Sequence, residues 1–305
     1  MAASEVAAAI AAGLRAGGRD AEELPVADGG DGTAEALVRA LGGEWVEADA
    51  TDALGRPIRA RFALLADGRA AVEAAEASGL ARIATRERDA FAASTRGTGE
   101  LIAAAVEAGA GTVIVAVGGT ASTDGAAGAL EALAEAGVRP KLIAVCDVRT
   151  PWERAAAVFA PQKGADSDSV KRLAARLARL AKRLPRDPRG VPLTGAGGGL
   201  SGGLWAGAGA ELVQGAPFVL DALGFDVRMR RAAFVVTGEG RIDEQTLQGK
   251  AAGEVAVRCR QAGVACHAIV GGDALDDFDV RVLALDSLSE AGDPVALTSA
   301  ARRLA

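Results

Sequence analysis

The chain has 305 residues, half of them hydrophobic, and a formal net charge of −6. This length allows one large domain or two modest ones, and the acidic balance with few aromatic residues argues against nucleic acid as a partner. No apolar run reaches the ~18 residues of a membrane span, and the first residues, with Glu5 and no basic stretch, are not typical of a secretory signal.

The N-terminal part of the chain predicts helices separated by a glycine-rich loop. Ser4–Leu14 predicts a helix whose first serine is its N-cap. Glu23–Val26 predicts a short strand that runs into the loop Ala27–Thr33, and Thr33–Leu41 predicts the next helix. This part therefore predicts one strand–loop–helix unit.

The same pattern returns further along the chain. Pro57–Leu65 and Arg69–Ala75 alternate polar with apolar residues and predict an antiparallel pair. Thr112–Val117 then predicts a buried strand, followed by the loop Gly118–Gly125 and a helix that ends at Glu135. We expect this second unit to resemble the first.

The second half of the chain adds two more buried strands. Leu142–Val145 predicts one that ends close to Asp147, and Ala232–Val236 predicts another that ends in a glycine-rich, charged loop. Lys250–Gln261 predicts the helix after that loop. The amphipathic segment Val170–Leu184 predicts an exposed helix, which we prefer to a membrane or partner helix.

Repeated strand–loop–helix units predict an α/β protein with a mostly parallel sheet. In such sheets, ligands bind at the carboxyl ends of the strands, where the glycine-rich loops of this chain are expected. These loops are therefore the places to look for chemistry.

Cysteine and histidine usage narrows that chemistry. The three cysteines have no disulfide or zinc spacing, which indicates reduced core residues in a cytosolic protein. The single histidine, His267, lies in the apolar segment Val264–Val270, where a core or strand-end histidine is commoner than a catalytic one. We therefore expect carboxylates, arginine and lysine to carry the chemistry.

Two loops offer carboxylates or anion-binding groups. Asp28 and Asp31 flank two glycines and could bind one cation, or Asp28 could take a hydroxyl proton. Taken alone, this loop favours an ordinary turn with a helix-capping Asp. Gly118–Gly125 offers backbone amides, hydroxyls and Asp124 at a helix N-terminus, a plausible anion cradle.

Two further loops contain a rare lysine or many glycines. Lys163 lies between a proline and Gly164 and is a candidate phosphate ligand, with an exposed turn lysine as the commoner alternative. Gly195–Gly203 matches G-x-G-x-x-G, but no convincing strand precedes it, and close helix packing through small residues is an equal explanation. No Walker-type motif occurs.

The loop within Val235–Lys250, VVTGEGRIDEQTLQGK, carries the densest charge. Its carboxylates could hold a metal and its Arg and Lys could hold anions, whereas a salt-bridged surface turn is the alternative. Glycine loops, carboxylates and isolated basic residues suit phosphoryl transfer, which depends on positioning and charge neutralisation. The residues alone thus indicate an α/β enzyme that handles a phosphate or another anion with Mg²⁺.

The loops occur in a recognisable order. They are ADGGDGT (Ala27–Thr33), GTGELI (Gly97–Ile102), GGTASTDGAAG (Gly118–Gly128), CDV (Cys146–Val148), VFAPQKGA (Val158–Ala165), GAGGGLSGG (Gly195–Gly203) and TGEGRIDEQTLQGK (Thr237–Lys250). This set resembles the bacterial glycerate kinases of the first type, from about Glu5 to about Val270. The PQKGA and GEGRID-x-QTL-x-GK motifs are far more specific than a lone glycine pattern.

The resemblance implies an ATP-dependent, cytoplasmic kinase that phosphorylates D-glycerate to 2-phosphoglycerate with Mg²⁺. It also implies two α/β domains. One is Rossmann-like, with a mostly parallel sheet, and is formed by residues 1–49 and 232–305. The other is a mixed α/β domain, residues 50–231, inserted in the first. A monomer or homodimer is expected, with no nucleic acid or membrane partner.

The chain departs from the family at two places. Family members begin with a strand and a PDxFKG-like loop, whereas this chain begins at the helix Ser4–Leu14. The resemblance thus implies an N-terminally shortened chain: either Met1 is an internal residue of a longer protein or the strand is absent, and with it an Asp and a Lys of the active site. The chain is also shorter between Ala136 and Lys141, where a reduced cap over the site is expected.

The resemblance and the loop chemistry together assign expected roles. The ATP phosphates are expected on the second loop and near Lys163, with the contributing residues Gly118, Gly119, Thr120, Ser122, Thr123 and Asp124. The expected Mg²⁺ ligands or water anchors are Asp147, Glu239 and Asp243. The expected catalytic residues are Asp28 or Asp31 as base, Arg241 for the glycerate carboxylate or the γ-phosphate, and Lys250 for developing charge.

Two alternatives remain open at this point. The scaffold could serve a kinase or phosphatase for another small hydroxy acid. It could also belong to a non-catalytic nucleotide or metabolite sensor that has lost the first loop.

Overall fold

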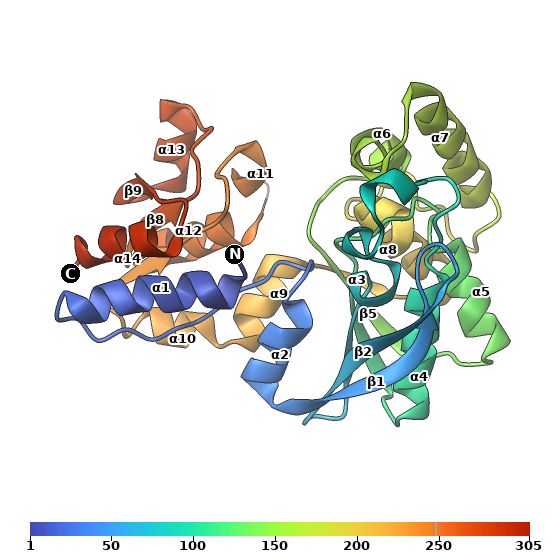
Figure 1. Ribbon diagram of the computed structural model, residues 1–305, viewed down its shortest axis with the longest axis horizontal. Helices are drawn as coiled ribbons and strands as arrows, with labels where there is room; N and C mark the ends of the chain where they lie inside the picture. The colour runs from blue at the N-terminus through green and yellow to red at the C-terminus, as the bar shows by residue number, and fades with distance from the viewer. Residues whose placement is uncertain (248) are drawn as a thin grey trace. The chain divides into compact units, whose positions relative to one another are not determined.

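The described chain, residues 1–247 and 249–305, forms a six-stranded and a three-stranded sheet in this computed structural model (Figure 1). Chain contacts divide it into two units, each with its own sheet: unit 1 is Met1–Ala27 with Val219–Ala305, and unit 2 is Asp28–Phe218. The expected α/β fold is confirmed.

The sheet of unit 2 is mixed. Its strands run in chain order: β1 (Gly43–Thr51), β2 (Pro57–Leu65), β3 (Ala70–Glu73), β4 (Thr112–Ala116), β5 (Lys141–Cys146) and β6 (Glu211–Gln214). The first three pair antiparallel and the last four pair parallel, so that β3 belongs to both arrangements. The carboxyl ends of β3 to β6 therefore lie at one edge of the sheet.

Helices cover this sheet and bury its apolar residues. The core includes Leu101, Val113, Leu200 and Leu204, all fully buried. The α-helices are α2 (Thr33–Leu41), α3 (Ala75–Ser78), α4 (Arg96–Glu107), α5 (Ala127–Glu135), α6 (Ala155–Phe159), α7 (Ser167–Ala181) and α8 (Ala196–Ala208). Helix α9 (Gly215–Ala222) spans the division between the units at Phe218 and Val219. Short 3-10 helices lie at Leu80–Arg82 (η1), Thr85–Glu87 (η2), Trp152–Arg154 (η3) and Pro161–Lys163 (η4).

Unit 1 has a parallel sheet in the order β7 (Phe234–Thr237), β8 (Ala265–Val270), β9 (Ser287–Glu290). Its helices are α1 (Ala3–Ala16), α10 (Phe225–Met229), α11 (Glu244–Leu247), α12 (Ala251–Ala262), α13 (Asp277–Leu283) and α14 (Pro294–Arg302). The first and last helices pack side by side (Figure 1). His267 lies in β8, where its Nδ1 is 2.8 Å from the Ser287 hydroxyl, as expected of a strand histidine.

Two local predictions for unit 1 need correction. The helix α1 starts after Ala2, whose amide donates to Glu5 at 2.8 Å, so Ser4 is not its cap. Residues Glu23–Val26 do not form a strand. Leu24 and Val26 instead pack against the core of unit 1, and no backbone ladder pairs with them.

The unit boundaries differ from the expected ones at 49/50 and 231/232. Residues 43–51 pair along their whole length with 57–65, because they form the β1–β2 hairpin of the larger sheet. Residues 28–49 therefore belong to unit 2. At the other end, residues 219–231 lie in unit 1, where Leu220 and Phe225 join its core.

Two further observations concern membrane-spanning helices and the cysteines. No helix among the described residues is long and apolar enough to cross a membrane. All three cysteines are buried and free.

Candidate active site

The loop Ala27–Thr33 crosses the carboxyl ends of the parallel strands of unit 2 through Gly29. The Gly29 carbonyl accepts a hydrogen bond from the Gly118 amide at 3.0 Å. Gly29 has a φ of 105°, and a Cβ there would lie 2.8 Å from the Val145 carbonyl oxygen and 3.0 Å from the Asp147 amide nitrogen. Only glycine can bring this loop so close to the strand ends.

Two carboxylates of unit 2 meet the glycine pair that follows β4. A Cβ on Gly118 would lie 3.0 Å from Asp147 Oδ2, and a Cβ on Gly119 would lie 2.8 Å from Asp31 Oδ1. The carbonyl oxygen of Asp28 is 1.7 Å from where a Cβ of Gly215 would be, so this loop also abuts the end of β6. The structure thus brings the expected residues of the first two loops and Asp147 together.

The loop Gly118–Gly125 is buried and polar. Asp124 Oδ2 accepts hydrogen bonds from the Thr95 amide and hydroxyl, both at 2.9 Å, and from the Gly128 amide at 3.2 Å. Asp124 therefore ties together the starts of α4 and α5. The hydroxyls of Ser122 and Thr123 are buried, and neither has a hydrogen-bond partner among the residues that the structure describes. Buried hydroxyls without a partner are uncommon and mark this loop as a candidate binding element.

Lys163 is buried rather than an exposed turn residue. Its Nζ donates to the Ser122 carbonyl and, at 3.3 Å, to the Thr120 hydroxyl. Burial lowers the pKa of Lys163 to about 8, while the negative charges of Asp124 and Asp147 oppose that shift. The expected phosphate ligand is therefore held against the second loop, and it still carries its charge at neutral pH.

The glycine-rich segment Gly195–Gly203 is mostly helical. It forms the first part of α8, interrupted where Gly197, Gly198 and Gly199 adopt positive φ. A Cβ on Gly203 would lie 2.0 Å from the Gly125 carbonyl oxygen, so close packing through small residues explains the pattern. A Cβ on Gly198 would lie 3.0 Å from Lys163 Nζ. The glycines of α8 thus let its backbone pack closely against the loop Gly118–Gly125 and against Lys163.

Sequence reasoning missed one ionisable group beside this site, Glu73 at the end of β3. Its Oε1 accepts a hydrogen bond from the Ala34 amide at 2.8 Å. Burial, together with the negative charges of Asp31 and Glu76, raises the pKa of Glu73 to about 7, against the favourable backbone amides of Ala34 and Gly32. The sequence feature that could have pointed to Glu73 is its position as the last residue of a short apolar strand.

This raised pKa makes the stability of unit 2 depend on pH. Between pH 4.5 and 7 the unfolded chain loses the Glu73 proton before the folded chain does, so folding is favoured below this window and loses stability as pH rises through it. Glu73→Gln removes this linkage. Its stability relative to wild type should rise between pH 5 and pH 8 by about 2–3 kcal/mol, measured by urea unfolding at both pH values. A difference between the proteins that does not change with pH would contradict this prediction.

The charged loop of unit 1 follows β7 and is organised by a buried threonine. The Thr246 hydroxyl donates to Glu239 Oε1 at 2.6 Å and lies 3.2 Å from the Asp243 amide. Arg241 is exposed, and Lys250 forms the N-cap residue of α12. The structure thus brings Glu239 and Asp243 into one turn at the carboxyl end of β7.

The expected Mg²⁺ ligands are divided between the units, with Asp147 in unit 2 and Glu239 and Asp243 in unit 1. Across residues 1–247 and 249–305, no three His, Cys, Asp or Glu side chains form a group that could hold a metal ion. Mg²⁺ usually binds one or two protein carboxylates and takes its other ligands from water and phosphate. Asp147 in unit 2, or Glu239 and Asp243 in one turn of unit 1, would each supply that number of carboxylates.

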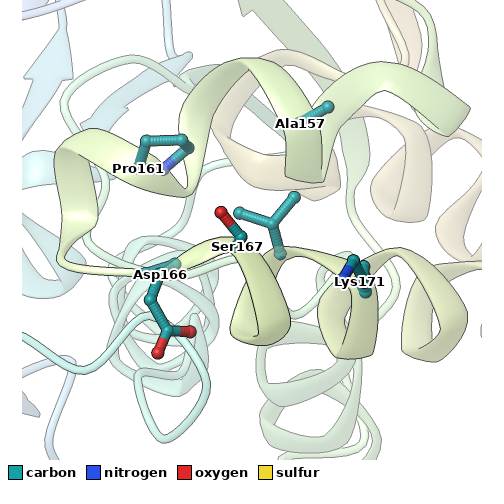
Figure 2. Close-up of a pocket in the computed structure, with 7 residues that line it drawn as sticks. Ala157, Pro161, Asp166, Ser167 and Lys171 are labelled. Atoms are coloured by element: carbon teal, nitrogen blue, oxygen red, sulfur yellow. The ribbon is translucent and has the colours of Figure 1, made fainter.

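A depression also lies on the surface of unit 2, beside η4, the 3-10 helix that carries Lys163. Figure 2 shows it between the segment of Ala157 and Pro161 and the start of α7, where Asp166, Ser167 and Lys171 border it. Its volume is about 570 Å³. None of the residues expected in the site lines it.

Comparison with known proteins gives a consistent result. The family model described as "Glycerate kinase family" matches residues 1–141 and 135–290. A glycerate kinase of Bacillus subtilis is 37% identical over 328 aligned residues, covering 94% of this chain and 86% of the relative. A glycerate 2-kinase of Escherichia coli is 37% identical, covering 82% of this chain and 76% of the relative.

A solved structure agrees with the sequence matches. The crystal structure of a "putative glycerate kinase 2" from Salmonella typhimurium LT2 superposes with a TM-score of 0.80 at 32% identity. It covers 98% of this chain and 92% of that one. With the matched motifs lying on the glycine loops and charged turns described above, the chain belongs to the glycerate kinase family.

Proposed function

We propose that this protein transfers the γ-phosphoryl group of ATP to a hydroxyl of D-glycerate, with Mg²⁺, and that the product is 2-phosphoglycerate. The family supports the kinase reaction and its substrate. The observation that carries the proposal is the approach of Asp31 and Asp147 to Gly118-Gly119, where side chains have no room. The space beside both glycines holds carboxylate oxygens, and such oxygens suit a Mg²⁺ ion that would accompany the phosphates.

The phosphates of ATP are proposed to lie along the loop Gly118–Gly125. Backbone amides and the hydroxyls of Ser122 and Thr123 would donate hydrogen bonds to phosphate oxygens. Lys163 supplies a positive charge beneath the loop, and an anion close to it would raise its pKa above its present value of about 8. These groups bind and orient the phosphates without a covalent intermediate.

Asp31, or Asp28 on the same loop, is proposed to accept the proton of the attacking glycerate hydroxyl. Asp147, Glu239 and Asp243 are the proposed Mg²⁺ ligands or anchors of its water molecules, because hard carboxylate oxygens suit this ion. When bound, Mg²⁺ would neutralise charge on the phosphate oxygens.

Arg241 and Lys250 are proposed to act on anions. The planar guanidinium of Arg241 suits a carboxylate or phosphate with two oxygens in reach, and it would orient glycerate or the γ-phosphate. Lys250, beside the N-terminus of α12, would stabilise charge that develops on the phosphoryl group.

A coupled ADP-release assay with D-glycerate and Mg·ATP tests the proposal. We expect turnover with D-glycerate and much less with L-glycerate or D-lactate, because the site must align one hydroxyl with the phosphate. Phosphorus NMR of the product should show 2-phosphoglycerate. Tight ATP binding without turnover would favour a non-catalytic sensor, and turnover with another hydroxy acid alone would overturn the substrate.

A further inference from the structure

Helix α2, which follows the Asp28–Asp31 loop, has no cap of its own. Its N-cap residue, Gly32, has a φ of 86° and no side chain to accept a hydrogen bond. The next two residues, Thr33 and Ala34, are each 1% exposed, so water does not reach their amides. The Thr33 amide donates to the Gly30 carbonyl at 3.3 Å, which leaves the Ala34 amide to be satisfied. A buried helix start with unsatisfied amides is destabilising.

The missing cap comes from another element. Glu73, at the end of β3, accepts a hydrogen bond from the Ala34 amide at 2.8 Å, across 39 residues of sequence. Its carboxylate also lies at the positive end of the α2 dipole. A residue of the sheet therefore fixes the first turn of this helix.

The first turn of α2 in turn fixes the loop. The Thr33 hydroxyl accepts from the Gly29 amide at 3.1 Å and donates to the Gly30 carbonyl at 2.7 Å. The Gly29 carbonyl then accepts from the Gly118 amide. These hydrogen bonds, joined by the backbone of Thr33 and Ala34, lead from Glu73 to Gly29 and Gly30, the two glycines between Asp28 and Asp31.

We propose that Glu73 is a positioning residue that holds Asp28 and Asp31 in place by capping α2 from the sheet, an inference that rests on the proposed kinase function. Glu73 acts through the backbone and does not need to touch either substrate. Burial and the nearby negative charge of Asp31 raise the pKa of Glu73. Keeping this carboxyl in its capping position therefore costs free energy when it is ionised. Arg61 and Arg82 pair with the other nearby acid, Glu76, and so leave Glu73 available to the helix.

Kinetic constants of Glu73→Ala and Glu73→Gln test this role. Glu73→Ala should lower kcat on the order of 10²-fold with little change in KM for ATP, because a displaced base slows transfer more than it weakens nucleotide binding. Glu73→Gln keeps a carbonyl oxygen for the Ala34 amide and should retain most of kcat. If Glu73→Ala fails to fold, Glu73→Asp, whose side chain is one methylene too short, should show the same loss of kcat.

The matched control is Asp293→Ala. Asp293 caps α14, a helix of nine residues like α2, by accepting from the Val295 and Ala296 amides at 2.9 Å. This variant should lose stability and keep kcat. Wild-type kcat in Glu73→Ala, or a loss in Glu73→Gln as large as in Glu73→Ala, would overturn the capping role.

Amide hydrogen exchange separates this inference from the proposed function. Exchange across residues 28–36 should be faster in Glu73→Ala than in wild type, and unchanged in Asp293→Ala. If the wild-type protein does not phosphorylate glycerate, the proposed function fails, and exchange alone then decides the positioning role. Unchanged exchange in Glu73→Ala would overturn it.

Discussion

Replacing Arg241 with alanine is expected to lower kcat/KM for glycerate by on the order of 10²-fold, the effect of removing ~3 kcal/mol of transition-state stabilisation. Arg241 is exposed in the charged turn after β7, so its loss should cost little folding stability. A large kinetic effect would therefore report on the reaction. Steady-state kinetics with glycerate and ATP varied separately would show which substrate the guanidinium binds.

Two further variants sharpen this experiment. Arg231, also exposed, lies at the amino end of β7, the opposite end from Arg241, so Arg231→Ala is a matched control that should keep kcat/KM. Arg241→Lys keeps the charge but loses the planar pair of donors, and it should fall between wild type and Arg241→Ala. Near-normal kinetics in Arg241→Ala would remove this residue from the proposed mechanism.

Local patterns predicted the elements that glycines delimit. Helix α2 has the predicted bounds Thr33–Leu41, because Gly32 and Gly42 both adopt positive φ and interrupt the helix there. The strand β2 also has its predicted bounds, Pro57–Leu65, as alternation and a tight turn specify one register. Loops between such elements could therefore be assigned to the carboxyl ends of strands.

Burial of the polar groups could not be predicted in the same way. Lys163 between Pro161 and Gly164 is a surface turn by its neighbours alone, and it is buried because Ser122 and α8 close over it. Glu73 is one glutamate after a short apolar strand, and its role depends on Ala34, which precedes it by 39 residues. The strand Gly43–Thr51 was also missed. These features arise from contacts distant in sequence.

Gly29→Ala is expected to lower both stability and activity strongly, whereas Gly32→Ala in the same loop should affect activity little. Both glycines have positive φ, 105° and 86°, so both alanines carry backbone strain of ~1–2 kcal/mol. Only at Gly29 does the new Cβ meet backbone atoms of Val145 and Asp147, at 2.8 and 3.0 Å. At Gly32 no heavy atom lies within 4 Å.

Comparing Gly29→Ala with Gly32→Ala thus separates the effect of backbone strain from the effect of moving the loop. Because strand ends are fixed by their ladders, Gly29→Ala must move the loop instead, breaking the Gly118–Gly29 hydrogen bond and shifting Asp28 and Asp31. A shift of about 1 Å in a catalytic group can reduce kcat on the order of 10²-fold, which a coupled assay on folded protein would detect. Thermal unfolding of the two variants would measure the shared strain. Equal loss of kcat in both variants would mean that backbone strain in the loop, rather than its close packing against the end of β5, limits the reaction.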